Sequence, residues 1–217
     1  MTEFHLHNGQ HITETVFVEG EYSLDIVLPE NASLELILIL LPGCGADIGI
    51  AASLTGAGAS LDISSATFAA AHDRFSIRTN VAHCAPGASS NQIFKNIAVG
   101  DSRVEFAGRI KVEEGSASTE AYQQCHSLLL SDSAVVTTCP ELEIYADDVK
   151  CSHGATVGRI NEDELFYMRS RGIGEQVAKS LLEKSFLFEV VDKIQDESLR
   201  AQVQAKFETA FEQYPGI

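Results

Sequence analysis

The chain has 217 residues, of which 45% are hydrophobic, enough for one substantial core and a small additional unit. Its 15 Lys and Arg residues against 31 Asp and Glu residues give a formal net charge of -16. Such a surface repels phosphate backbones and anionic lipid headgroups, which argues against a nucleic-acid-binding or membrane-surface protein. Most of the charge lies in residues 1–158, which hold 7 basic and 20 acidic side chains, whereas residues 159–217 hold 8 and 11.

The chain carries no signal for membrane insertion or export. No stretch approaches the roughly 18 uninterrupted apolar residues of a membrane-spanning helix. The N-terminus holds His5, His7 and His11 in place of the basic start and apolar run of a signal peptide. We therefore expect a cytoplasmic location. The five cysteines are an odd number without a Cys-x-x-Cys pair, which argues against a disulfide framework and a four-cysteine zinc site.

From Thr13 to about Val157 the chain reads as short strands separated by Gly, Asn, Asp and Ser. No helical pattern interrupts these strands, which excludes a doubly wound α/β fold and leaves a sandwich, a barrel or a β-helix. Small residues inside the strand-like segments, such as Ala107 and Gly108, favour a β-helix with crowded inward positions. The scarcity of Asn-Gly hairpin turns also favours it. Because no clean repeat length is visible, the pattern alone prefers the β-helix only slightly over the sandwich.

The pattern then changes to helices. Asn161 and the three acidic residues after it form an N-cap with a negative first turn, which predicts a helix starting there. A second amphipathic helix is expected to end near Phe186, and a third to cover residues 199–211. We therefore predict a β-domain at residues 1–158 and a small helical domain at residues 159–217.

The segment 142–158 carries the chemistry. Apolar residues at the even positions from Leu142 to Ala146 are expected to face the core. If the strand continues without a bulge, Cys151 and His153 lie on the opposite, outward face, roughly 7 Å apart. A thiolate and an imidazole at this spacing suit one metal centre or two adjacent irons of a cluster. Two ligands are too few for a closed site, so the pair indicates a half-site completed by a partner chain. A bulge at Asp147–Asp148 would turn the pair inward.

A structural role for these residues must be weighed against the functional one. A Cys-x-His pair is usually structural, because a free cysteine packs like a small hydrophobic residue. Among the other candidates, His83 and Cys84 are expected in a surface turn, Cys44 in another turn, and Cys125 as a packed thiol. Cys139 lies near the pair in the sequence and is a weaker candidate for a role beside it.

Several segments resemble one known family. The run ADDVKCSHGATVGRI (146–160), followed by LFYMRSRGI (165–173), resembles the most distinctive signature of the SufB/SufD family, the scaffold proteins of the Suf iron–sulfur assembly machinery. SSNQIFKNI (89–97), VEFAGRIKV (104–112) and LLLSDSA (128–134) are similar to it as well. The likeness is clear from about residue 83 to residue 186. It implies a right-handed parallel β-helix with a C-terminal helical domain.

The resemblance also implies partners and a site. A SufC-type ATPase is expected to bind the helical domain, and a SufB-type subunit or a second copy of the chain to form a dimer through the end of the β-helix. The histidine of the family motif matches His153 and the neighbouring thiol matches Cys151, at an interface where a transient iron–sulfur cluster is assembled. Gly154 stands where SufB-type members have a glutamate, which indicates the SufD side.

No catalytic residue is assigned, and the chain has no Walker motif, so we expect a non-enzymatic scaffold. Full-length members of the family are usually longer at the N-terminus, so the chain is either a minimal member or a fragment. Whether iron, sulfur or both bind at Cys151 stays open, as does the choice between a homodimer and a SufB heterodimer.

Two alternatives to this assignment stay open. One is a β-helix enzyme acting on polysaccharide through the carboxylates of Glu141, Glu143 and Asp147. The absence of Trp and an aromatic content of 7% leave few platforms for sugar stacking. The other is a purely structural SufD that stabilises SufB without contacting iron.

Overall fold

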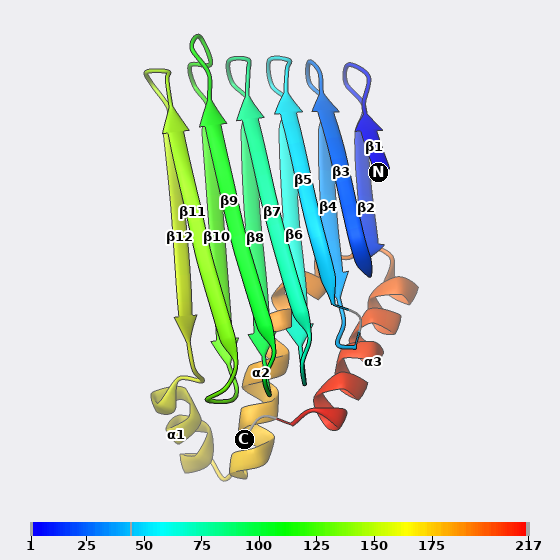
Figure 1. Cartoon of the computed structure of the whole chain (residues 1–217), viewed down its shortest axis with the longest axis vertical. Helices are drawn as coiled ribbons and strands as arrows, with labels where there is room; N and C mark the ends of the chain where they lie inside the picture. Colours follow the sequence, from blue (N-terminus) through cyan, green and yellow to red (C-terminus); the bar gives the residue numbers. More distant parts are fainter. Residues whose placement is uncertain (1, 44, 216–217) are drawn as a thin grey trace.

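The protein is a parallel β-solenoid followed by three helices. The computed structural model describes residues 2–43 and 45–215. Each coil contributes one strand to each of two parallel six-stranded sheets, which pack face to face (Figure 1). Sheet A has the order β1-β3-β5-β7-β9-β11, and sheet B has the order β12-β10-β8-β6-β4-β2. The mainly β architecture with C-terminal helices is therefore confirmed.

The strands lengthen from the first coil to the later ones. Sheet A consists of β1 (Thr2–His5), β3 (Gly20–Leu28), β5 (Ala46–Leu54), β7 (Arg74–His83), β9 (Arg103–Val112) and β11 (Val135–Ile144). Sheet B consists of β2 (His11–Phe17), β4 (Ser33–Leu40), β6 (Ser60–Ala69), β8 (Ser89–Ala98), β10 (Glu120–Leu129) and β12 (Lys150–Gly158). The helices are α1 (Glu162–Ser170), α2 (Glu175–Val191) and α3 (Glu197–Gln213).

The coils differ in length, which explains why the sequence has no clean repeat. The stacked residues at the start of the strands of sheet B are Ser33, Ser60, Ser89, Glu120 and Lys150, and they are 27, 29, 31 and 30 residues apart. The strands themselves keep their register, so the variation falls in the turns. A fixed period therefore cannot be read from the sequence although the stacking is regular.

The interior of the solenoid changes from apolar to polar along its axis. One column of stacked inward positions reads Leu36, Ile63, Gln92, Gln123 and His153 from the second coil to the last. The first four of these side chains are buried. The early coils therefore hold the main hydrophobic core, and the later coils place polar groups in equivalent positions.

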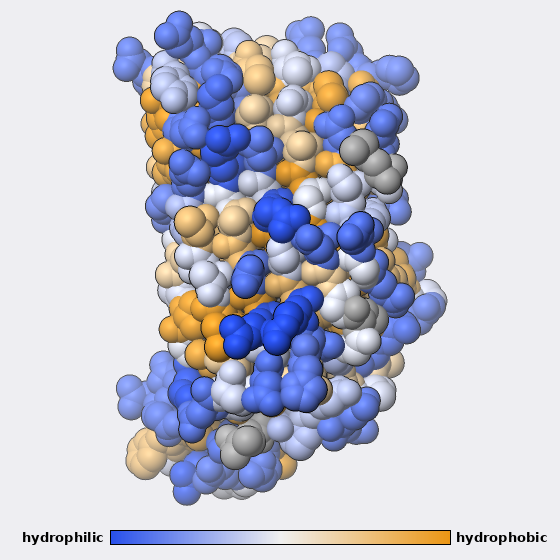
Figure 2. Space-filling view, viewed as in Figure 1, coloured by the Kyte–Doolittle hydropathy of each residue, from blue (hydrophilic) through white to orange (hydrophobic). Residues whose placement is uncertain are grey.

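Helices cover the outer face of sheet B. α2 packs against β6 and β8, and the rings of Phe68 in β6 and Phe211 in α3 lie 4.9 Å apart between centroids. Strand β4 is consequently buried on both faces from Leu36 onward, which is why residues 36–40 read as a continuous apolar run. No described helix covers sheet A, and its outer face carries many hydrophilic side chains (Figure 2).

The change from strand to helix occurs where the sequence predicts it. β12 ends at Gly158, and the Asn161 side chain caps α1 by accepting a hydrogen bond from the Asp163 backbone N–H at 2.9 Å. α2 continues to Val191, past the expected end at Phe186, because its last turn is buried against the solenoid. The division into domains at 1–158 and 159–217 stays a prediction. No helix in the described ranges is long and apolar enough to cross a membrane.

Of the two small residues expected at crowded inward positions, only Gly108 faces the interior. Gly108 does face the interior, where a Cβ would approach the Gln123 amide to 2.5 Å. Ala107, in contrast, is exposed on the outer face of β9, because neighbouring residues of a strand point to opposite sides.

We predict that Phe68→Ala destabilises the protein by about 3–5 kcal/mol, because Phe68 is fully buried between sheet B and α3. Phe166→Ala removes a ring that is 71% exposed and serves as the control, with an expected change within about 0.5 kcal/mol. Urea unfolding followed by circular dichroism measures both. Equal effects of the two substitutions would contradict the proposed packing of the helices on sheet B.

Candidate functional site

The segment that carries the motif forms two strands in different sheets. β11 ends at Ile144 in sheet A, and β12 begins at Lys150 in sheet B. The turn between them contains Asp148 with a left-handed backbone, φ 54°. Aspartate tolerates this conformation better than most residues because its short side chain can bond locally. The expectation of one continuous strand was therefore wrong, and the break lies at the Asp147–Asp148 pair.

Cys151 and His153 consequently lie on the inner face of the solenoid. In the register of β12 with β10, Cys151 pairs with Ala121 and His153 pairs with Gln123. Both partners are buried, and paired residues of neighbouring strands point to the same side of a sheet. The outward orientation expected for an unbroken strand is thus wrong, and the pair has the inward orientation expected for a break at Asp147–Asp148. β12 is nevertheless the last strand of its sheet, so no further coil among the described residues covers the pair.

The two side chains differ in their exposure. Cys151 is half-buried and packs with Leu142 and Val149 against a small cluster that contains Ile110 and Ala121. Burial raises the pKa of the Cys151 thiol, and a hydrogen bond with the backbone of Ala121 opposes this shift. His153 is exposed. A molecule approaching the end of the solenoid could therefore reach the imidazole directly and the thiol at its edge.

The last coil also exposes apolar side chains on its inner face. Ile144 of β11 and Val157 of β12 are each 44% exposed, although their partners Val112 and Ser127 in the preceding coil are buried. Figure 2 shows hydrophobic side chains at the left edge of the molecule, where this coil lies. Tyr145, in the turn after β11, is 58% exposed. The surface formed by Cys151, His153, Ile144, Tyr145 and Val157 is termed the open end.

A buried polar network lies directly beneath His153. The Gln123 side-chain Nε2 donates to Gln92 Oε1 at 3.1 Å and to Thr79 Oγ1 at 3.4 Å. Thr79 Oγ1 in turn donates to Gln92 Oε1 at 3.2 Å. The sequence analysis did not identify these glutamines. Ser90, Gln92 and Phe94 are two residues apart along β8 and therefore share one face. The apolar Phe94 is the signal that could have placed Gln92 inside.

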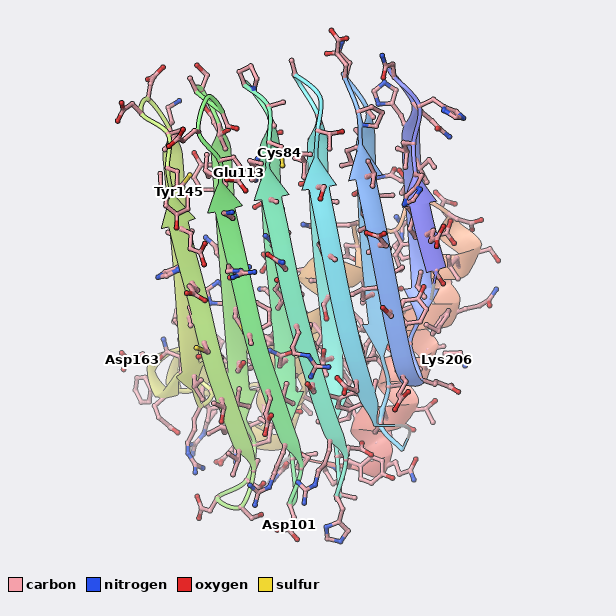
Figure 3. All side chains as sticks on the ribbon, turned by 45° about the horizontal axis from the view of Figure 1, so that its top comes forward. Cys84, Asp101, Glu113, Tyr145, Asp163 and Lys206 are labelled. Carbon is pink, nitrogen blue, oxygen red and sulfur yellow. The ribbon has the colours of Figure 1, made fainter. Side chains whose placement is uncertain are left out.

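His83, Cys84 and Cys125 lie away from the open end. His83 is buried, contrary to the predicted surface turn; its Nε2 lies 2.9 Å from Ser90 Oγ, and burial lowers its pKa to about 4. Cys84 is exposed, and it stacks with Glu113 and Tyr145 at the ends of β7, β9 and β11 (Figure 3). Burial and Glu113 raise the Cys84 pKa. Cys125 is buried as predicted, and desolvation raises its pKa to about 11.

Cys139 is not brought together with the Cys151–His153 pair. It is exposed and pairs with the exposed Ala107, so it lies on the outer face of β11. Cys44 is outside the described residues. Within the described part of the chain, no three His, Cys, Asp or Glu side chains gather in a way that could hold a metal ion. The described residues thus offer at most part of a ligand set.

A hollow on sheet A does not coincide with the motif. It has a volume of about 440 Å³ and lies over the starts of β3, β5, β7 and β9, where Arg74 and Arg103 line it. It belongs to the outer face of sheet A. The open end, in contrast, is a surface that a second chain could cover.

Comparisons with known proteins show the family of the chain. Residues 22–186, more than half of the chain, match the profile of the SUF system FeS cluster assembly, SufBD core domain. The chain belongs to the SufB/SufD family. It is 37% identical to the iron-sulfur cluster assembly protein SufD of Escherichia coli (strain K12), over 84% of this chain and 43% of SufD.

Two further relatives match a shorter part of the chain. The iron-sulfur cluster assembly SufBD family protein slr0076 of Synechocystis sp. is 40% identical over 55% of this chain and 26% of its own length. The chloroplastic protein ABCI7 of Arabidopsis thaliana is 40% identical over 55% of this chain and 25% of its own length. The chain therefore spans less than half the length of each of these relatives, and its cytoplasmic location stays a prediction.

We predict that the thiols react with iodoacetamide in the order of their accessibility and thiolate content. Cys139 is expected to react before Cys151, because burial reduces access to Cys151 and raises its pKa. Cys125 is expected to react only after unfolding. Mass spectrometry of the labelled peptides at several pH values gives the rates, and the Cys151 rate is expected to rise with pH. Rapid labelling of Cys125 in the folded protein would contradict its placement in the core.

Proposed function

We propose that the chain is a SufD-like, non-enzymatic scaffold subunit that holds Cys151 and His153 at a subunit interface for the assembly of an iron–sulfur cluster. One observation carries this proposal. An exposed imidazole and a half-buried thiol share the inner face of the last coil, at an end that nothing in the described chain closes. The same missing cover leaves the ligand set incomplete and apolar side chains exposed, so one partner could remedy both.

The chemistry of the pair suits a transient cargo. Cysteine thiolates and imidazole nitrogens are ordinary ligands of iron, and a thiolate also accepts transferred sulfur. Because burial raises the Cys151 pKa, the thiol is mostly protonated at neutral pH, and metal binding has to release the proton. Two protein ligands bind less tightly than the four of a structural site, which favours release of a finished cluster.

The open end is the proposed contact for a SufB-like subunit or a second copy of the chain. β11 and β12 are the last strands of their sheets, so each presents an unpaired edge of backbone N–H and C=O groups. Such edges pair readily with a strand of another chain. Covering Ile144 and Val157 would add hydrophobic stabilisation to this pairing.

The helical segment is the proposed contact for a SufC-like ATPase. Phe166 and Tyr167 of α1 are 71% and 59% exposed, and Val177 and Leu181 of α2 are 57% and 46% exposed. α1 and α2 contact each other, so their exposed apolar side chains form a candidate docking surface. Arg169 pairs with Glu175 at 3.3 Å, and the Arg171 guanidinium lies over the Tyr167 ring, which supports a local structural role for both arginines.

The polysaccharide-enzyme alternative gains no support from the placement of its acids. Glu143 lies on the outer face of β11 and accepts a hydrogen bond from Arg109 at 3.2 Å. Asp147 lies in the turn that follows β11. The purely structural SufD differs from our proposal in one expectation. It would support cluster assembly even after simultaneous substitution of Cys151 and His153.

We predict that His153→Ala lowers cluster assembly in a reconstituted system with its ATPase partner, while the fold stays intact. The physical reason is that the substitution removes an exposed metal ligand. The His153 side chain makes no hydrogen bond in the described structure. His126→Ala is the matched control, since His126 is on the neighbouring strand but pairs with Thr156 on the outer face. If His153→Ala and the double substitution with Cys151→Ala both assembled clusters at the wild-type rate, the site assignment would fail and the purely structural role would stand.

We predict that the double substitution Phe166→Ser and Leu181→Ser weakens co-purification of the SufC-like ATPase at least tenfold, because it removes the centre of the exposed apolar surface. Phe17→Ser on β2, at the other end of the chain, is the control with a similar exposed ring. Isothermal titration calorimetry gives the affinity of each variant. An unchanged affinity would place the ATPase contact elsewhere.

A further inference from the structure

The buried polar network beneath the open end has one unused acceptor that lies next to His153 in the stack. Gln123 is 1% exposed, and its Nε2 is engaged by Gln92 and Thr79. Its Oε1 is buried and has no hydrogen-bond partner among the described residues. A buried acceptor without a partner costs about 1–3 kcal/mol, so its persistence calls for an explanation.

The position of this acceptor is set by the strand opposite. A Cβ on Gly108 of β9 would lie 2.5 Å from both atoms of the Gln123 amide, so the amide crosses the interior and rests against the Gly108 backbone. In the next coil, Pro140 takes the place of Gly108 and His153 takes the place of Gln123. His153 therefore stacks on Gln123 at the usual strand spacing of about 4.8 Å, with Pro140 across the interior.

We propose that Gln123 is a positioning residue for His153: its Oε1 accepts a hydrogen bond from one imidazole N–H and fixes the tautomer and the orientation of the ring. The other ring nitrogen then presents its lone pair toward the open end. This inference rests on the proposed function of His153 as an iron ligand. The described structure does not contain this hydrogen bond, so the exposed His153 side chain has to rotate toward Gln123 to form it, and that rotation does not require iron.

The chemistry follows the general behaviour of metal-binding histidines. Such a histidine usually donates its second N–H to a neighbouring oxygen, which raises the basicity of the ligating nitrogen and holds the ring in place. An exposed imidazole without this contact would divide its population between two tautomers and several rotamers. The interior ladder of Thr79, Gln92 and Gln123 holds the acceptor rigidly from the opposite side. A hydrogen bond to His153 would satisfy the one orphan oxygen of Gln123.

The tautomer of His153 provides a test that needs no cluster. Nitrogen-15 NMR of the full chain at a fixed pH of about 8 distinguishes the two neutral tautomers, and a His153→Ala spectrum assigns the signals. We expect one tautomer to dominate in the wild type. In Gln123→Met, which removes the acceptor at similar volume, we expect a mixture like that of the exposed His7. Gln123→Glu keeps an acceptor oxygen and is expected to retain the dominant tautomer.

Gln92→Met is the matched control, because it disturbs the same buried ladder one coil farther from His153. The proposal is overturned if Gln123→Met leaves the His153 tautomers as in the wild type, or if Gln92→Met changes them equally. In reconstituted assembly we expect Gln123→Met to lower the rate about tenfold relative to Gln92→Met. If the tautomer shifts but His153→Ala has no effect on assembly, the hydrogen bond stands and the proposed function fails. If assembly requires His153 but the His153 tautomers do not respond to Gln123→Met, the proposed function stands and the proposed hydrogen bond fails.

Discussion

The geometry of this protein depends on the fact that each coil of a solenoid is closed by the next one. Inward side chains are buried only if stacked strands continue on both sides, as they do for Gln92 and Gln123. At β11 and β12 the stacking stops among the described residues. Side chains that would be interior in a middle coil are there accessible, while their backbone is held by parallel pairing on one side. A rigid, half-open position for Cys151 and His153 is the direct consequence.

Sheet B is the sheet on which the helices pack. Sheet B is covered by α2 and α3, and the shared cluster around Phe68 and Phe211 fixes the helices to the solenoid. The partly buried Lys95 adds an ion pair with Glu189 of α2 and lies over the Phe186 ring. Because these contacts hold α2 against the sheet, a force applied by a partner on the helices reaches the same sheet that ends in β12. This connection would give the proposed ATPase partner a physical route from the helices to the proposed site.

The polar interior of the later coils carries an energetic cost. His83, Gln92, Asn96 and Gln123 each have one buried side-chain atom without a hydrogen-bond partner among the described residues. At about 1–3 kcal/mol per group, such atoms are unfavourable compared with the leucine and isoleucine of the early coils. All four residues belong to β7, β8 and β10, toward the end that carries the motif. Proteins accept such destabilising buried polar groups near functional sites, because the function requires them.

The sequence by itself determined the class of the fold and the family. Strand patterns without helical interruption, the Asn161 cap and the motif around Cys151 and His153 were sufficient, because each depends on neighbours in the chain. Only the tertiary structure decided which way the pair points. Alternation along a strand has a period of two, so the turn at Asp147–Asp148 that passes the chain from sheet A to sheet B reversed the predicted face. The burial of His83 and the stacking of His153 on Gln123 likewise depend on residues about 30 positions apart, whose register is set by variable turns and leaves no local signal in the sequence.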